Sequence, residues 1–98
     1  MIVKYSKQQT AVAGSISFNS DDLRGICYRI YVSPATSTTT YDVTITDDNS
    51  AVIYSKKGLR GTLNDLSTQT LKGIHTIAVN NASVNEQFTF QIEYQEDP

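Results

Sequence analysis

His75 is the only histidine of the chain, and histidine is the residue type most often used as a general base. A histidine-based hydrolase also needs a Ser, Thr or Cys nucleophile beside it and a carboxylate that orients the imidazole. No nucleophile elbow or related motif is present in the sequence. His75 alternates instead with Ile77 and Val79, which predicts a packed, hydrogen-bonded histidine in the core of a strand. We therefore expect no enzyme and no catalytic residue.

Asp47, Asp48 and Asn49 carry side-chain oxygens that could bind calcium, an ion that takes six to eight such ligands. Their spacing does not match an EF-hand loop. The same residues favour a hairpin turn in which an aspartate side chain accepts hydrogen bonds from the backbone that follows it. Asp21 and Asp22 have the same reading as turn residues. No metal site and no cofactor are expected.

Tyrosines are the residues best suited to a binding surface, because flat aromatic rings are used both by sugar sites and by protein interfaces. Tyr28 and Tyr94 lie in the apolar phase of their segments and are expected in the core. Tyr31 lies in the opposite phase, beside Arg29, and is the best candidate for an exposed contact. A neighbouring Tyr and Arg are also an ordinary pair on a sheet face.

Composition limits the remaining classes of function. The net charge is −2 over 98 residues and no cluster of Lys and Arg exists, so a nucleic-acid partner is not expected. The first residues do not resemble a signal peptide and no segment is apolar over the length of a membrane span, so export and a membrane partner are not expected either. Cys27 is the only cysteine, which excludes an internal disulfide and suits a reducing compartment. The length predicts one domain over residues 1–98.

Apolar residues recur at every second position along most of the chain, and this period predicts short β-strands. The pattern predicts strands over residues 2–6, 10–18, 24–33, 41–46, 51–55, 75–79 and 88–94, a turn at 19–22, and an irregular crossing at 64–72 with Leu66 and Leu71 as anchors. In the strand over 24–33, Ile26, Tyr28, Ile30 and Val32 are assigned to one face and Cys27, Arg29 and Tyr31 to the other. Seven or eight short strands separated by polar turns predict an all-β fold, an antiparallel β-sandwich or jelly roll, with a small closed barrel as the alternative.

Two resemblances follow from this pattern. The segments 41–47, 52–55, 59–63, 73–81 and 88–94 resemble the small sandwich modules of the bacterial pre-peptidase C-terminal type, which show a strand, an Asp-rich turn, a Gly before alternating residues, an Asn-containing turn and a last aromatic strand. In its short length and hydroxyl-rich strands, and in lacking a secretion signal, the chain is also similar to small tailed-phage virion accessory proteins such as capsid decoration proteins.

The second resemblance implies a non-enzymatic structural or interaction protein of a virion, assembled in the host cytoplasm. Its partners would be other virion proteins such as the capsid, or further copies of itself. The alternative is a carbohydrate-binding sandwich module that uses surface tyrosines to bind a glycan. Gene neighbourhood beside a major capsid gene would separate these two hypotheses.

The two ends of the chain suggest where an interface lies. Lys4 and Lys7 are near the start, whereas Glu93, Glu96 and Asp97 are near the end, so the two segments can pair within one subunit or between neighbours. Surface ion pairs contribute only about 0 to 1 kcal/mol each, so apolar residues would have to supply most of the affinity. The expected interface residues are Ile2, Val3, Lys4, Tyr5, Arg29 and Tyr31.

Overall fold

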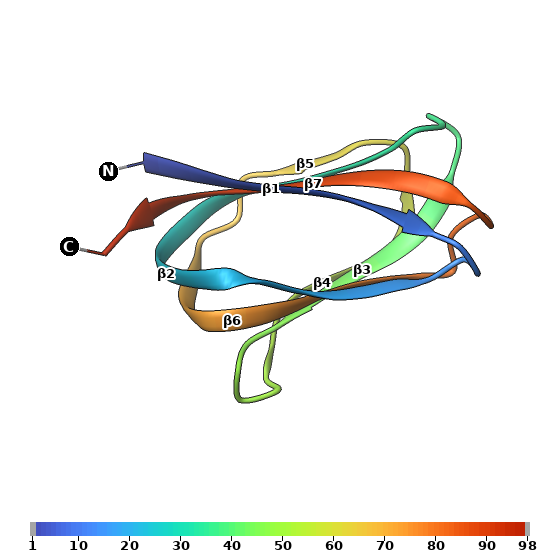
Figure 1. Cartoon of the computed structure of the whole chain (residues 1–98). Helices are drawn as coiled ribbons and strands as arrows, with labels where there is room; N and C mark the ends of the chain where they lie inside the picture. The colour runs from blue at the N-terminus through green and yellow to red at the C-terminus, as the bar shows by residue number, and fades with distance from the viewer. Residues whose placement is uncertain (1, 98) are drawn as a thin grey trace.

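Residues 2–97 are described by the computed structural model, and most of them lie in strands joined by short turns (Figure 1). The seven strands are β1 (Ile2–Ala11), β2 (Ile16–Pro34), β3 (Thr40–Thr46), β4 (Val52–Arg60), β5 (Leu63–Asp65), β6 (Gln69–Asn80) and β7 (Glu86–Glu96). All strand pairs are antiparallel. The prediction of an all-β fold is confirmed. No helix within residues 2–97 is long and apolar enough to cross a membrane.

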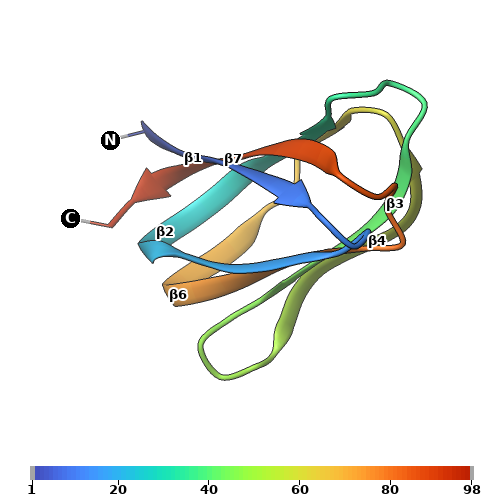
Figure 2. The ribbon, with the colours of Figure 1, turned by 45° about the vertical axis from the view of Figure 1, so that its right-hand side comes forward.

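β2 joins the two layers of the sandwich. The strands follow one another in the order β1-β7-β2-β6-β3-β4, with β5 paired to β2. The first part of β2, residues 16–27, pairs with β6, while residues 25–34 pair with β7. β1, β7, β5 and the second half of β2 therefore form one layer, and β4, β3, β6 and the first half of β2 form the other (Figures 1 and 2).

Aromatic side chains fill the space between the layers. The ring centroids of Phe18 and Phe90 are 5.0 Å apart, and those of Tyr41 and Phe88 are 5.1 Å apart, both in edge-to-face geometry. The inward phase of β7, predicted from its period of two, is confirmed, because every second side chain of this strand is buried. The burial of these rings and of the aliphatic residues around them is the main stabilising contribution available to the fold.

Two bulges in β2 change which of its residues face the core. The first places Ser20 and Asp21 opposite the single residue His75 of β6. The second leaves Tyr28 unpaired between Cys27, opposite Tyr94, and Arg29, opposite Glu93. Each bulge shifts the alternation by one residue. The buried positions of β2 are Ile16, Ser20, Leu23, Gly25, Cys27, Ile30, Val32 and Pro34.

These bulges overturn two predictions. Residues 19–22 form no chain-reversing turn, because β2 continues through them as a bulged strand. Ile26 and Tyr28 do not share the inward face with Ile30 and Val32: Ile26 is 45 % exposed, Tyr28 is half-buried, and Cys27 is fully buried instead. The expectation of a core Tyr28 is therefore wrong, whereas the core position of Tyr94 is confirmed.

Two further segments differ from the prediction. The single strand expected over residues 10–18 is interrupted by a tight turn after Ala11, where Gly14 N–H donates to the carbonyl of Ala11 at 3.2 Å and Val12 is exposed. The crossing expected over residues 64–72 contains β5 and the start of β6. Leu71 is buried as an anchor, but Leu66 is 79 % exposed and anchors nothing.

Candidate interaction surfaces

The outer face of β1, β7 and the second half of β2 is here named the β7 face. Its side chains form rows across the three strands, which the register defines. One row is Lys4, Glu93 and Arg29, and the next is Ser6, Gln91 and Tyr31. A third row brings Ile2 and Ile26 to either side of Gln95, with 56 % and 45 % of the two isoleucines exposed.

Four of the six predicted interface residues lie together on the β7 face: Ile2, Lys4, Arg29 and Tyr31. The other two, Val3 and Tyr5, point to the opposite side of β1. Val3 packs against the core and Tyr5 is buried within it at 9 % exposure. Tyr5 therefore cannot offer its ring to a partner while the chain is folded. The oppositely charged end segments are also neighbours within the chain, since Lys4 lies opposite Glu93 in the strand register.

Polar contacts hold the centre of the β7 face in place. Arg29 Nε donates to Asn64 Oδ1 at 2.8 Å, and Arg29 Nη1 lies 3.6 Å from Glu93 Oε1. Burial of the Tyr28 phenol, and after it the nearby Glu93 carboxylate, raises the pKa of Tyr28. Tyr28 thus belongs to this surface, which the sequence pattern did not show, because only the bulge turns its ring outward.

The strand edges are poorly suited to pairing with another chain. β1 carries Lys4 and Lys7, and β4 carries Lys56 and Lys57 beside a bulge at Gly58. The free edge of the first half of β2 is interrupted by its own bulge. Charged side chains and bulges at edges are common protections against strand addition. Faces and loop ends are therefore the better candidates for contact with a partner.

The outer face of β6 and its neighbours, here named the β6 face, has a different chemistry. The register aligns Ser17, Ala78, Thr44 and Ser55 in one row, and Asn19, Thr76, Thr46 and Val52 in the next. These rows contain small, uncharged side chains and no aromatic ring. Thr76 Oγ1 donates to Asn19 Oδ1 at 3.1 Å, which leaves fewer free polar groups for a partner.

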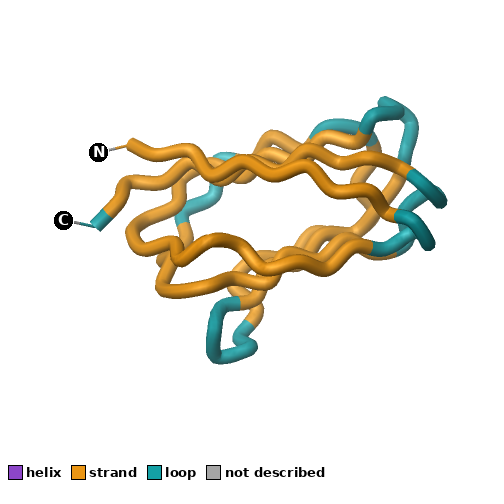
Figure 3. Tube along the Cα trace, in the orientation of Figure 1, coloured by secondary structure: helices purple, strands orange, loops and turns teal. Residues whose placement is uncertain are grey.

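Four loops gather at the end of the sandwich opposite the two chain ends, and we name this region the distal end (Figure 3). They are residues 12–15, 35–39, 61–62 and 81–85, and none of them contains a charged residue. At its tips Val12 is 67 % exposed and Val84 is 68 % exposed. The hairpin turn at the other end, by contrast, carries Asp47 and Asp48.

Backbone hydrogen bonds tie the distal loops to one another. Ala82 N–H donates to the carbonyl of Gly14 at 2.9 Å, and Asn85 N–H donates to that of Ala11 at 2.7 Å. Thr36 N–H donates to the buried carboxylate of Glu86 at 2.6 Å, which fastens the loop after β2 to the start of β7. Loops ordered in this way lose little conformational entropy when a partner binds.

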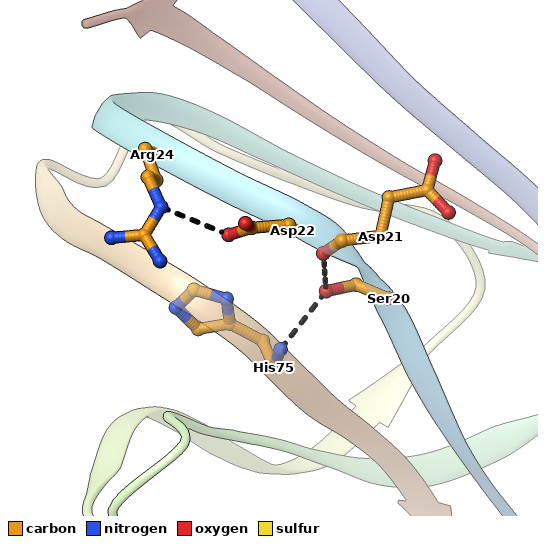
Figure 4. Close-up of polar contacts among 5 residues, drawn as sticks. All are labelled: Ser20, Asp21, Asp22, Arg24 and His75. Carbon is orange, nitrogen blue, oxygen red and sulfur yellow. Dashed lines mark hydrogen bonds and ion pairs between the residues drawn. The ribbon is translucent and has the colours of Figure 1, made fainter.

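His75 is the other polar feature of note (Figure 4). It is fully buried, as predicted, and its backbone N–H donates to Ser20 Oγ at 3.0 Å while Ser20 Oγ donates to the carbonyl of Asp21 at 2.7 Å. The prediction of a hydrogen-bonded ring is wrong: neither Nδ1 nor Nε2 has a partner among the described residues. Figure 4 shows that the contact of His75 with Ser20 runs through the backbone N–H and not through the ring.

The Asp47–Asn49 turn has the predicted form. Asp47 Oδ1 accepts hydrogen bonds from the backbone N–H groups of Asn49 and Ala51, both at 2.9 Å. Asp48 instead lies over Gly73, beside a surface depression that Asp22, Arg24 and Ile74 also line. Within residues 2–97 no three His, Cys, Asp or Glu side chains are grouped as a metal site would require.

Comparison with known proteins shows the fold. No protein-family model matches the chain, and no curated protein matches its sequence. A chain of the cyanophage Pam1 capsid asymmetric unit matches with a TM-score of 0.56 and 14 % identity, over 99 % of this chain and 84 % of that one. The Drosophila NLP core, whose structure concerns pentamer formation and histone binding, matches with a TM-score of 0.54 and 16 % identity, over 99 % of this chain and 100 % of that one. FLHE matches with a TM-score of 0.50 and 8 % identity, over 97 % of this chain and 98 % of that one.

Proposed function

We propose that the chain is a non-enzymatic structural protein of a virion, an accessory protein that binds to a capsid in the manner of a decoration protein. The observation that carries this proposal is the likeness over 99 % of the chain to a polypeptide of a phage capsid. A shared sandwich fold hosts many functions, so the surfaces of this chain must supply the rest of the argument.

The distal end has the chemistry of a docking surface for such a partner. Protein interfaces are depleted of charged residues at their centre, and the four distal loops contain none. Val12 and Val84 project from loops that backbone hydrogen bonds hold in place. A neutral, apolar depression on the capsid surface is the partner that fits these side chains.

The test uses virus particles purified from a lysate of cells infected by the phage that carries this gene. The chain should be found in banded particles by mass spectrometry, and purified protein should co-sediment with particles that lack it. Val12→Asp together with Val84→Asp should abolish co-sedimentation, because two buried carboxylates would lose their hydration at the contact.

The matched control is Val52→Asp, which changes a valine of 60 % exposure away from the distal end. It should co-sediment as the unchanged protein does. Absence of the chain from banded particles contradicts the proposed function. Equal loss with the control variant contradicts the assignment of the distal end.

Carbohydrate binding is the second candidate, and one observation favours it. The half-exposed ring of Tyr31 lies in a row with Gln91 and Asn64, whose amides can hydrogen-bond sugar hydroxyls. A glycan array would test this candidate with the unchanged chain and with Tyr31→Ala. Saturable binding that the substitution removes would favour a carbohydrate module over a capsid partner.

A further inference from the structure

We infer that the β7 face is the contact between two copies of this chain, related by a two-fold axis that crosses the strands at the row of Ser6, Gln91 and Tyr31. The inference concerns self-assembly, and it holds or fails independently of whether the partner of the distal end is a capsid. It rests on side-chain type, on available area and on the arrangement of charge.

Side-chain type favours the β7 face over the β6 face. Interfaces between proteins are enriched in Tyr and Arg and depleted of Ser and Ala. The β7 face carries Tyr28, Tyr31 and Arg29 beside the exposed Ile2 and Ile26. The β6 face also exposes apolar side chains, Val52 and Ile74, but its two central rows contain no Tyr and no Arg.

Area favours a face over an end. The molecule measures 40 × 23 × 20 Å, so a broad face covers roughly 900 Å² in projection, close to the ~800 Å² per partner that a stable interface buries. An end covers roughly half of that, which is below the usual range for a stable pair. A pair formed through the faces would leave both distal ends accessible.

The charges of the β7 face are compatible with this axis. With the axis across the strands at Gln91, Glu93 of one copy lies opposite Thr89 of the other, and Arg29 lies opposite Ser33. Lys4 similarly lies opposite Gln8. Every charge therefore meets a neutral side chain that can form hydrogen bonds, and the two Tyr31 rings meet at the axis. An axis along β7 would place Glu93 against Glu93, an arrangement that like-charge repulsion disfavours. An axis parallel to the strands between β7 and β2 would oppose Glu93 to Arg29, but these two side chains already pair within each copy at 3.6 Å. Thr89 would then lie opposite Ser33 and not Glu93, so variants of Thr89 distinguish the two axes.

Sedimentation equilibrium of the full chain, from micromolar to millimolar concentration, tests the inference. The unchanged protein should form dimers in a concentration-dependent manner. Gln91→Lys places two ammonium groups opposite each other at the axis and should raise the dissociation constant by at least about tenfold. Thr44→Lys makes the matched change on the β6 face and should leave the dissociation constant unchanged.

A charge pair tests the axis itself. Thr89→Lys places an ammonium opposite Glu93 of the second copy and should tighten the dimer at low salt, whereas Thr89→Glu should weaken it. A monomer at every concentration overturns the inference, as does an equal loss with Thr44→Lys. Equal effects of the two Thr89 variants overturn the proposed axis. Circular dichroism of each variant confirms that the sandwich is folded.

Discussion

At the scale of single residues, the first bulge of β2 provides a hydrogen-bond acceptor for the backbone N–H of His75 but no partner for its ring nitrogens. The extra residue at Ser20 and Asp21 brings the Ser20 hydroxyl to the backbone N–H of His75. The imidazole itself faces the apolar core, where neither nitrogen finds a partner among the described residues. A buried polar atom without a partner costs roughly 1–3 kcal/mol of stability.

Replacing the imidazole by an apolar side chain should therefore not weaken the fold. His75→Leu is expected to leave the free energy of unfolding unchanged or raise it by about 1 kcal/mol, because the unpaired nitrogens are removed while the volume is kept. Urea denaturation at pH 7.5 measures this. His75→Ala, which leaves a cavity, is the control and should destabilise the protein. A large loss with leucine would mean that the imidazole makes favourable polar contacts.

The buried tyrosines predict sensitivity to alkali. Burial raises the pKa of Tyr41 from 10.0 to about 12, and burial followed by the hydrogen bond to Asp65 raises that of Tyr54 further. The folded state favours the neutral phenol, because the pKa of each tyrosine is higher in the folded state than in the unfolded state. The contribution of this preference to the free energy of unfolding is fully present below pH 10. It falls by up to ~1.4 kcal/mol per pH unit for each tyrosine as the pH rises from 10 towards the folded pKa.

Urea midpoints between pH 8 and pH 12 test this expectation. Tyr41→Phe should show a shallower decline above pH 10, although it starts from a lower stability, because the hydroxyl donates to the carbonyl of Gly61 at 2.7 Å. A midpoint that stays constant to pH 12 would contradict the burial of these phenols.

At the scale of elements, β2 separates what the sequence could predict from what it could not. A period of two predicted β3, β7 and the last part of β6 correctly, because buried and more exposed residues alternate without interruption along the buried part of each strand. In β2 the phase changes at Ser20 and again at Tyr28. A bulge depends on contacts with the strands on either side, and no local pattern in the sequence carries that information.

Deletion of Tyr28, the residue of the second bulge, tests the register assigned to β2. Removal of Tyr28 should be tolerated at moderate cost, since Cys27 and Arg29 can then occupy consecutive positions opposite Tyr94 and Glu93. Removal of Tyr31 should abolish folding. If residues 32–34 keep their partners on β7, the residues before them shift by one position, and Arg29 then points into the core. Amide spectra or circular dichroism of the two variants distinguish these outcomes, and equal behaviour would contradict the assigned register.

The bend of β2 between the layers depends on Gly25. This residue has a φ of +147°, and a Cβ there would lie 1.9 Å from the carbonyl oxygen of Gln95. Gly25→Ala should therefore prevent folding or lower the melting temperature strongly. Gly58→Ala is the control, because its φ is also positive at +65° but its Cβ would meet nothing within 4 Å. It should cost only about 1 kcal/mol. Similar melting temperatures would argue against this bend.

At the scale of the whole molecule, the sequence predicted the architecture, but it did not show which of the candidate interface residues share a face. Short alternating segments and polar turns were sufficient to predict an antiparallel sandwich. The grouping of Lys4, Arg29 and Tyr31 on one face required β7 to lie between β1 and β2, an arrangement that joins the two ends of the chain. Pairing between strands so distant in sequence leaves no signal in either segment alone.

The place of β1 also predicts the effect of truncation. Deletion of residues 1–6 removes half of a strand paired to β7 and takes Tyr5 out of the core. The truncated chain should lose at least about 3 kcal/mol of stability, as for other large buried side chains. Thermal unfolding measures the loss, with Lys4→Ala as a control that should cost little. An unchanged melting temperature would mean that β1 is dispensable.

The pairing of Ile2 with Gln95 has a practical consequence for protein engineering. The first and last described strands leave the sandwich side by side, at the end opposite the distal loops (Figure 1). A peptide fused to either strand would emerge from the same pole of the molecule, so one scaffold could present two cargoes next to each other. A short linker between them would also permit circular permutation, with new ends opened in the 47–51 hairpin turn.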